Sequence, residues 1–298
     1  MEQLYKQYKL QYAVKSDVGK VRGENQDCYS YSKTGKAQLF VVADGIGGAF
    51  GGEIASFAVC RVLSHHAFSA DGRITEESLS KAIERANHVV YYLGNNYPEF
   101  SGMGTTVAVL GISGTECIIA YIGDSRIYCM SQGKLVRISE DHTVAGELLK
   151  NNSISENLLK NSGANHILTR SIGQLYTAHQ GAEIKTVPLH PGCSFLLCSD
   201  GLTGLVNDEK ISEIMRSEES SLNSIPEKLV AMANDNGGRD NVTAMVVKVD
   251  EVFSEEPLRL LNQKVVDVVL PRNTAAHIDF DNIDKTLQSL AGKMPPTT

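Results

Sequence analysis

Three apolar runs of the chain end in an aspartate. The runs are "LFVVAD", "CIIAYIGD" and "FLLCSD", which end at Asp44, Asp124 and Asp200. A fourth acid, Asp240, comes just before an apolar run, in "NGGRDNVTAMVVKV". A single aspartate at a strand end is most often a turn former or a helix cap. Four of them can share one rim of a sandwich of sheets, where their mutual repulsion would need cations to offset it.

Oxygen ligands without cysteine or histidine are typical of sites for hard divalent ions such as Mg²⁺ or Mn²⁺. Two such ions that share a carboxylate can hold a water molecule, lower its pKa and polarise an electrophile for in-line attack. The glycines that follow Asp44 suit this chemistry. Without a Cβ at Gly45, the backbone carbonyl could approach an ion, and Gly47 and Gly48 leave room for a bulky anionic substrate.

The segment "SDVGKVRGENQDCY" adds one cation, Arg22, in a turn-rich stretch, with Asn25 and Asp27 close behind. A lone arginine is most often a solvated surface residue. Beside an anionic substrate, however, a guanidinium can form a bidentate clamp on phosphate oxygens.

The periodicity of the apolar residues predicts which elements carry these groups. Residues 53–68 and 75–96 have the spacing of amphipathic helices, and Thr75 suits the N-terminus of the second. Short runs rich in β-branched residues predict strands within 104–112, 116–124, 125–139, 193–200 and 241–250. "MSQGKL" predicts a hairpin turn. Strands from several parts of the chain with paired helices between them favour an α+β fold, with antiparallel sheets flanked by helices.

Composition narrows the class of protein. The 298 residues are 42% apolar, which is enough for a real core in one large or two modest domains. The formal charge of −7 comes with no block of Lys or Arg, so we expect no nucleic-acid or lipid-surface partner. No stretch approaches the roughly 20 apolar residues of a membrane span, and the N-terminus lacks the apolar region of a signal peptide. We therefore expect a cytoplasmic protein. We also expect it to be a monomer.

Two segments stand apart from the predicted sheets. Residues 142–165 are polar and rich in Asn and Ser, with a weak helical stripe. Residues 251–298 form an extension in which Ile283, Leu287, Leu290 and Met294 have helical spacing. Such a stripe most often packs on its own domain, and the alternative is a regulatory or partner-docking segment.

Taken together, eight stretches of the chain resemble the PP2C (PPM) family of metal-dependent protein serine/threonine phosphatases, in its compact bacterial form. In order, they are "SDVGKVRGENQD", "VVADGIGGAFGGEIAS", "MGTTVAVLGI", "AYIGDSRIYCM", "SEDHTVAGELL", "NHILTRSIG", "FLLCSDGLTGLV" and "GGRDNVTAMVVKV". They cover about residues 10–250 in the order that is found in the family.

The resemblance implies a central β-sandwich of two antiparallel sheets flanked by helix pairs, with a catalytic domain at residues 1–250 and a flap at about 142–165. It implies two core ions, Mn²⁺ or Mg²⁺, and a third, weaker one. The implied reaction is hydrolysis of phosphoserine and phosphothreonine by a metal-bridging hydroxide, without a phosphoenzyme. The implied partners are phosphoprotein substrates that are targets of a Ser/Thr kinase.

Carried over position by position, the resemblance gives each acid a role. Asp44 would bridge the two core ions and Gly45 would offer its carbonyl. Asp200 and Asp240 would complete the centre, and Asp124 would help Asp200 to hold the third ion. Arg22 would bind the substrate phosphate.

This chain departs from the family pattern at two positions. Where the family reads Asn-Glu-Asp, the chain has Asn25-Gln26-Asp27, so an amide replaces the acid expected to orient metal-bound water. Gln26 can still hydrogen-bond that water, but it brings no charge. At position 46 some relatives carry a histidine that is proposed to protonate the leaving group, and Ile46 cannot do this.

Two other functions compete with the phosphatase. A weakened PP2C-like protein could bind phosphoproteins without turning them over, and Gln26 is its only support. A two-metal phosphodiesterase would share the oxygen ligands but not the ordered set of motifs.

Overall fold

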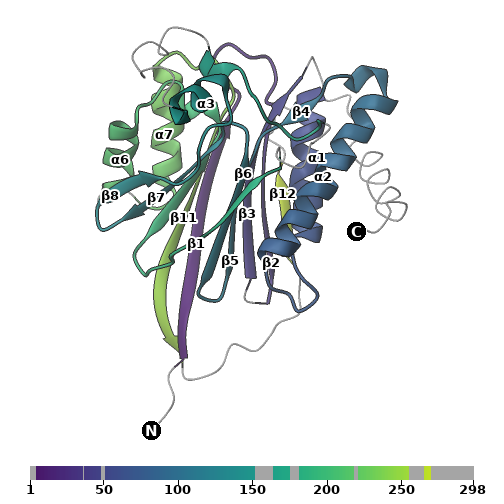
Figure 1. The fold of residues 1–298 in the computed structure, drawn as a ribbon. Helices are drawn as coiled ribbons and strands as arrows, with labels where there is room; N and C mark the ends of the chain where they lie inside the picture. Colours follow the sequence, from purple (N-terminus) through teal and green to yellow (C-terminus); the bar gives the residue numbers. More distant parts are fainter. Residues whose placement is uncertain are drawn as a thin grey trace.

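Two antiparallel sheets face each other in the computed structural model of the chain, and helices cover the outer face of each sheet (Figure 1). The structure describes residues 5–35, 37–47, 51–151, 164–174, 181–217, 221–254 and 265–269. The predicted fold class, an α+β sandwich of two antiparallel sheets flanked by helices, is confirmed.

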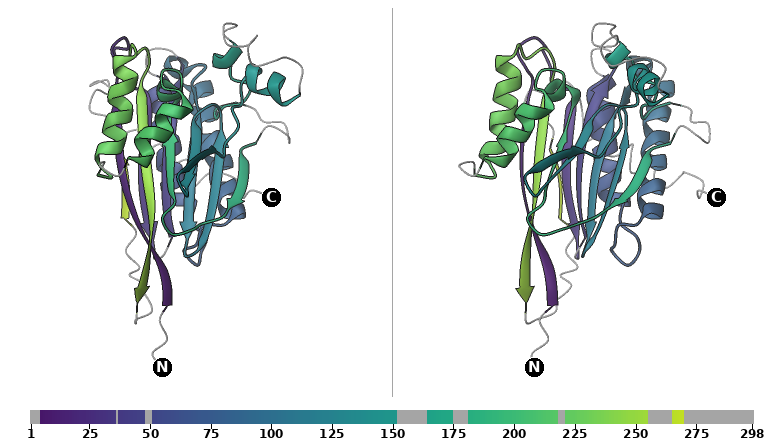
Figure 2. Two further views of the ribbon diagram at one scale, coloured as in Figure 1. Left: turned by 90° about the vertical axis from the view of Figure 1, so that its left-hand side faces the viewer. Right: turned by 60° about the vertical axis from the view of Figure 1, so that its left-hand side comes forward.

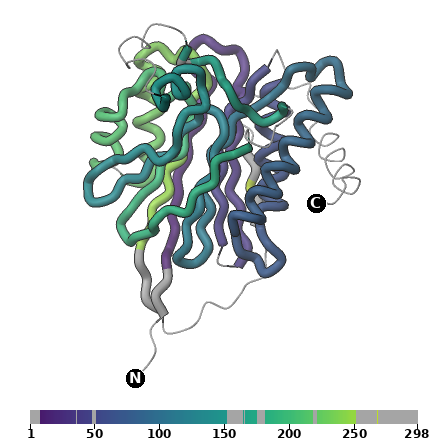
Figure 3. The backbone as a smooth tube through the Cα atoms, in the orientation of Figure 1, coloured from purple at the N-terminus to yellow at the C-terminus, as the bar shows by residue number. Residues whose placement is uncertain are grey.

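The first sheet has five strands in the order β1-β11-β10-β7-β8. Their bounds are β1 Tyr5–Asp17, β11 Val242–Ser254, β10 Ser194–Cys198, β7 Arg126–Ser131 and β8 Lys134–Arg137. The chain crosses from β7 to β8 at Gln132 and Gly133, both at positive φ, as the predicted hairpin turn requires. β1 pairs with β11 in antiparallel register, and Figure 3 shows the two strands side by side, so an early and a late segment of the chain meet in one sheet.

The second sheet has the order β12-β2-β3-β5-β6-β9, with the short β4 paired to β3 off this path. The bounds are β12 Val265–Val269, β2 Asp27–Thr34, β3 Ala37–Ile46, β4 Gly104–Thr105, β5 Val107–Ser113, β6 Glu116–Ile122 and β9 Glu183–Val187. β3 lies between β2 and β5, so the strand that carries Asp44 is held on both sides by hydrogen bonds.

Helices form the outer layers (Figure 2). The helices over the second sheet are α1 Gly51–His66 and α2 Glu76–Asn96, and η1 Pro98–Phe100 follows them. The first sheet is covered by α6 Asp208–Arg216 and α7 Ser224–Asp235, preceded by the short α5 Asp200–Thr203. α3 Val144–Lys150 and η2 Ala164–His166 lie outside the layers. The Thr75 side chain accepts a hydrogen bond from the Ser78 N–H, which confirms the predicted start of α2.

The core has three apolar layers because successive side chains of a strand point to opposite faces. On β3, Phe40 and Val42 pack between the two sheets, whereas Leu39 and Val41 pack under α1 and α2. A third cluster fills the space between the first sheet and α5, α6 and α7. β3 is buried on both faces, which explains why its sequence is an unbroken apolar run up to Asp44.

The outlying segments are described in part. α3 accounts for the start of the predicted flap, and residues 152–163 lie outside the described residues. β11 runs past Asp250 to Ser254, and β12 extends the second sheet beside β2. The apolar stripe from Ile283 to Met294 lies outside the described residues, so the boundary at residue 250 and the role of 251–298 stay predictions. No helix among the described residues is long and apolar enough to cross a membrane.

Candidate metal and phosphate site

The four aspartates singled out in the sequence line one cavity of about 460 Å³. Asp44 lies near the end of β3, and Asp124 follows β6 by two residues. Asp200 follows β10 and opens α5, and Asp240 comes two residues before β11. The same cavity is lined by the other site residues that the sequence predicts, Arg22, Gln26 and Gly45. The structure therefore brings together every residue of the predicted site.

The backbone of Asp44 is fixed by two threonines. The Asp44 N–H donates to Thr106 Oγ1 (3.0 Å), and the Thr106 N–H donates back to the Asp44 carbonyl (2.9 Å). Thr105 Oγ1 donates to the same carbonyl (2.8 Å). Because both the N–H and the carbonyl of Asp44 are hydrogen-bonded, the backbone that carries the Asp44 carboxyl group is held in a fixed position.

Gly45 lies where no other residue fits. A Cβ at this position would be 2.1 Å from the Gly52 carbonyl oxygen and 2.6 Å from that of Gln26. The Gly45 N–H donates to the same Gln26 carbonyl (3.1 Å). The loop before β2, the end of β3 and the first turn of α1 therefore meet at this glycine.

Asn241 ties Asp240 to the loop that carries Arg22. Its Oδ1 accepts from the Gln26 N–H (2.8 Å), and its Nδ2 donates to the carbonyls of Val18 (3.0 Å) and Glu24 (2.9 Å). Its own N–H donates to Asp240 Oδ1 (2.9 Å), while Arg22 Nη2 donates to Asp240 Oδ2 (2.8 Å). The arginine and the acid are thus oriented by the same asparagine.

The carboxyl groups of the cavity destabilise one another's charged forms. Burial, followed by repulsion from Asp27 and Asp200, raises the pKa of Asp44 well above its ordinary value. Burial and then Asp200 raise the pKa of Asp124 to about 8. Burial and then Asp240 also raise the pKa of Asp200, although a hydrogen bond with Asp44 acts in the opposite direction. Such a cluster has a high affinity for positive charge.

Asp27 belongs to the same cluster, although the sequence pattern gave it no role. It faces Asp44 across the β2–β3 hairpin and is almost fully buried. Its Oδ2 accepts from Ser199 Oγ (2.8 Å) and Thr243 Oγ1 (2.6 Å), and its Oδ1 has no hydrogen-bond partner among the described residues. Burial raises its pKa to about 7. The signal in the sequence is an acid directly before the alternating run "CYSYS".

His166 is a second residue that the sequence pattern missed. It is the last residue of η2 and lines the cavity, with its Nδ1 3.9 Å from Asp200 Oδ2. Ile46 lines the cavity as well, half-buried and without a group that could donate a proton.

The donor set fits hard divalent ions. Its side-chain oxygens come from carboxylates, and burial together with mutual repulsion raises the pKa values of Asp44 and Asp124, so a cation would stabilise their charged forms. Among the described residues, no three Asp, Glu, His or Cys side chains already form a group that could hold an ion by themselves. Backbone carbonyls and water molecules commonly complete the coordination of such ions, and Gly45 lines the cavity.

Comparison with known proteins decides the family. The sequence profile of the protein phosphatase 2C family matches residues 21–241. The chain belongs to this family. A serine/threonine phosphatase of Listeria innocua is 31% identical to this PP2C chain over 241 residues, which cover 78% of the chain and 94% of the relative.

Solved structures agree with this assignment of the PP2C chain. The serine/threonine phosphatase of S. agalactiae has a TM-score of 0.72 and 29% identity, over 81% of this chain and all of that one. The catalytic domain of the phosphatase PstP, in complex with two manganese ions, has a TM-score of 0.70 and 30% identity, over 82% and 99% of the two chains. The family predicted from the sequence is confirmed, and the chain is a serine/threonine phosphatase of the PP2C type.

Proposed function

We propose that this phosphatase hydrolyses phosphoserine and phosphothreonine in proteins with the help of two Mn²⁺ or Mg²⁺ ions. The proposed ligands are Asp44, which would bridge the ions, the Gly45 carbonyl, Asp200 and Asp240. The observation that carries the proposal is the convergence of these residues on one cavity in which carboxyl pKa values are raised. The two manganese ions in the PstP structure support the number and kind of ions.

Divalent ions bound there would lower the pKa of a water molecule, provide the attacking hydroxide and draw charge from the phosphate. The protein residues do the rest. Arg22 lines the cavity, and its Nη2 donates to Asp240 Oδ2 while Asn241 bonds the other oxygen, so the remaining guanidinium donors can clamp two phosphate oxygens. The threonine contacts to Asp44 prevent its backbone from shifting as charge develops.

The third ion is proposed at Asp124. Burial raises the pKa of this residue to about 8, and repulsion from Asp200 adds to the effect, so a cation between the two carboxylates would stabilise both. At Gln26 the proposal is a water-mediated contact, since an amide oxygen can accept a hydrogen bond from a coordinated water.

The wider biology is also proposed. The substrates would be phosphoproteins, as for the serine/threonine phosphatases that the chain resembles, and their kinase would be of the Ser/Thr class. Residues 1–250 would form the catalytic domain, with an extension at 251–298 that packs or regulates. The monomeric state and the cytoplasmic location remain predictions from the sequence.

The test is hydrolysis of p-nitrophenyl phosphate and of a phosphothreonine peptide with Mn²⁺. We expect activity that depends on the ion and falls at least 100-fold in Asp200→Asn. Activity that survives this substitution would refute the proposed centre. Calorimetry with the phosphopeptide separates the alternative, because a weakened binding protein would hold the peptide and release no phosphate.

A further inference from the structure

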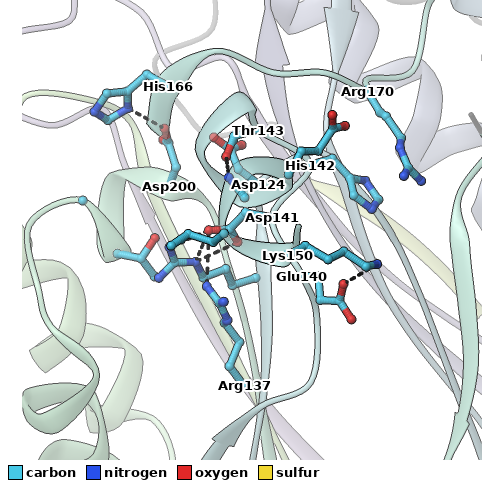
Figure 4. A pocket seen from close by; sticks show the side chains of 16 residues that line it. Asp124, Arg137, Glu140, Asp141, His142, Thr143, Lys150, His166, Arg170 and Asp200 are labelled. Carbon is cyan, nitrogen blue, oxygen red and sulfur yellow. Dashed lines mark hydrogen bonds and ion pairs between the residues drawn. The ribbon is translucent and has the colours of Figure 1, made fainter. Parts of the chain in front are cut away.

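A second cavity, of about 800 Å³, adjoins the catalytic one and shares Asp124, His166 and Asp200 with it. Its other walls come from β7, the end of β8, residues 140–150 and α5. Figure 4 shows His166 and Asp200 together on one side of this cavity, with Arg137 well away from them beyond Asp141. The second cavity therefore begins beside the catalytic one and extends from there toward Arg137.

One carboxylate of this cavity pairs with two arginines. Arg126 holds Asp141 through Nε (3.0 Å to Oδ1) and Nη2 (2.7 Å to Oδ2), and its Nη1 donates to Tyr128 Oη. Arg137 Nη1 reaches the same carboxylate at 3.3 Å. Asp141 is thus already neutralised by Arg126, and the charge of Arg137 is in excess.

The neighbouring carboxylate repeats this arrangement with lysines. Glu140 Oε2 accepts from Lys150 Nζ (2.8 Å), and Oε1 accepts from Lys185 Nζ (3.3 Å). Asp141 and Glu140 thus pair with four cationic side chains between them. Lys185 does not line the cavity, whereas Glu147 on α3 does, so the positive charge along this wall is local to Arg137, which shares its carboxylate with Arg126.

Arg137 is the cation best placed to bind a ligand. Its side chain is 39% exposed, against 23% for Arg126, and within the described part of the chain its guanidinium makes no hydrogen bond besides the one to Asp141. A guanidinium with free donors matches the two oxygens of a carboxylate.

We propose that the second cavity binds the substrate chain beside the phosphorylated residue, and that Arg137 there takes an acidic side chain of the substrate. The proposal rests on the proposed function, because the catalytic cavity fixes where the phosphorylated residue lies. An extended chain advances about 3.4 Å per residue, so a glutamate a few residues from the phosphothreonine can enter this space. The phosphatase would accordingly prefer sites with an acidic residue on that side.

The experiment uses one phosphothreonine peptide with Glu, Gln or Lys placed in turn at each of the four positions on either side. For the unmodified protein we expect kcat/KM to be about fivefold higher with Glu than with Gln at one or more positions. In Arg137→Gln this preference should vanish, mainly through KM. Asp141 keeps its bonds to Arg126, so the variant should fold normally.

Two controls separate recognition from a structural effect. Hydrolysis of p-nitrophenyl phosphate, which has no flanking residues, should be unchanged in Arg137→Gln, whereas failure of the proposed catalytic function would abolish it in both proteins. Arg216→Gln removes a cation from α6 that lines neither cavity, and it should keep the preference for Glu.

Charge reversal and salt complete the test. Arg137→Glu should prefer Lys-bearing peptides, and 0.5 M NaCl should weaken the preference of the unmodified protein, because an exposed ion pair is screened. Equal kcat/KM for the Glu and Gln peptides at every position, or a preference for Glu that persists in Arg137→Gln, would overturn the proposal.

Discussion

Arg22 Nη2 lies 2.8 Å from Asp240 Oδ2, although the two residues are 218 positions apart in the chain. The pair joins the proposed phosphate ligand to a proposed metal ligand. Both side chains are well exposed, at 57% and 38%, so the ion pair contributes little to stability. Its importance is positional, because a cation that binds Asp240 has to share this carboxylate with the guanidinium.

Substitution of Arg22 should therefore weaken the interaction with the substrate phosphate and strengthen the binding of the metal ion. In Arg22→Gln we expect kcat/KM for a phosphothreonine peptide to fall about 100-fold, because a charged donor to the phosphate is lost. Mn²⁺ should bind a few-fold more tightly, because Asp240 loses a competing cation. Steady-state kinetics and calorimetry without substrate measure the two effects.

Lys20→Gln is the matched control for this prediction. Lys20 lies on the same loop, but its Nζ pairs with Asp235 (3.7 Å) rather than with the carboxylate cluster. The control should leave both quantities unchanged. Weaker Mn²⁺ binding in Arg22→Gln would contradict the competition between the ion and the guanidinium.

Metal binding should stabilise the protein more at pH 8 than at pH 6. The folded-state pKa values of Asp27 and Asp124, about 7 and about 8, lie above the ordinary value of 3.8. Without an ion, the stability associated with these groups is fully present below about pH 4. It is lost progressively as the pH rises from about 4 and is gone above about pH 8, because over that range the folded state holds protons that the unfolded state has already released.

The measurement is the melting temperature with and without Mn²⁺ at each pH. The ion replaces the missing protons, so the rise in melting temperature should be several degrees larger at pH 8. Asp124→Asn should reduce the pH dependence of the metal-free protein. An equal rise at both pH values would show that the carboxylates do not charge in this range.

A methyl group at position 45 should disrupt the site. Gly45→Ala would place a Cβ 2.1 Å from the Gly52 carbonyl oxygen, and we expect a loss of about 3 kcal/mol in the free energy of unfolding. Gly23→Ala is the control, because nothing lies within 4 Å of its added Cβ, and its change should stay within about 0.5 kcal/mol. Urea unfolding of the metal-free proteins compares them, and similar stabilities would argue against the tight junction at Gly45.

An acid at position 26 should tighten metal binding. Gln26 Oε1 lies against the first turn of α1, 2.7 Å from where a Cβ on Gly52 would be. A negative charge is favourable at a helix N-terminus, and it would add to the charge that attracts the ions. We expect a three- to tenfold lower Kd for Mn²⁺ in Gln26→Glu, measured by calorimetry.

Gln38→Glu tests whether charge alone explains that gain. Gln38 Oε1 accepts from Tyr31 Oη (3.0 Å) toward the opposite end of β3, and glutamate can accept the same bond. Its Kd should be unchanged. If both variants bind Mn²⁺ equally well, the amide at position 26 does not limit the affinity.

The sequence was sufficient to predict the acids that end apolar strands. Asp44, Asp124 and Asp200 each follow a run whose burial on both faces of a sheet can be inferred from composition. Asp27 was not predicted to belong to the site, because its place there depends on strand register. Only the pairing of β2 with β3 places it opposite Asp44, and that register is not visible in the residues themselves.

The second cavity was even less predictable from the sequence than the position of Asp27. Arg137 is one cation among many in the sequence, and nothing in "KLVRIS" distinguishes it. It becomes distinctive only when the turn after β8 brings Asp141 back beside Arg126, so that one carboxylate meets two guanidiniums. Surplus charge is a property of the packed structure, which single-sequence patterns do not contain.

The pairing of β1 with β11 also governs when this enzyme can become active during its synthesis. β1 is made first, but its partner begins at Val242, and Asp240 is made just before that strand. A chain still on the ribosome without these residues has an incomplete carboxylate cluster and an unpaired first strand. With Asp240 as a proposed metal ligand, we therefore expect the nascent protein to remain inactive until β11 has been translated and has left the exit tunnel.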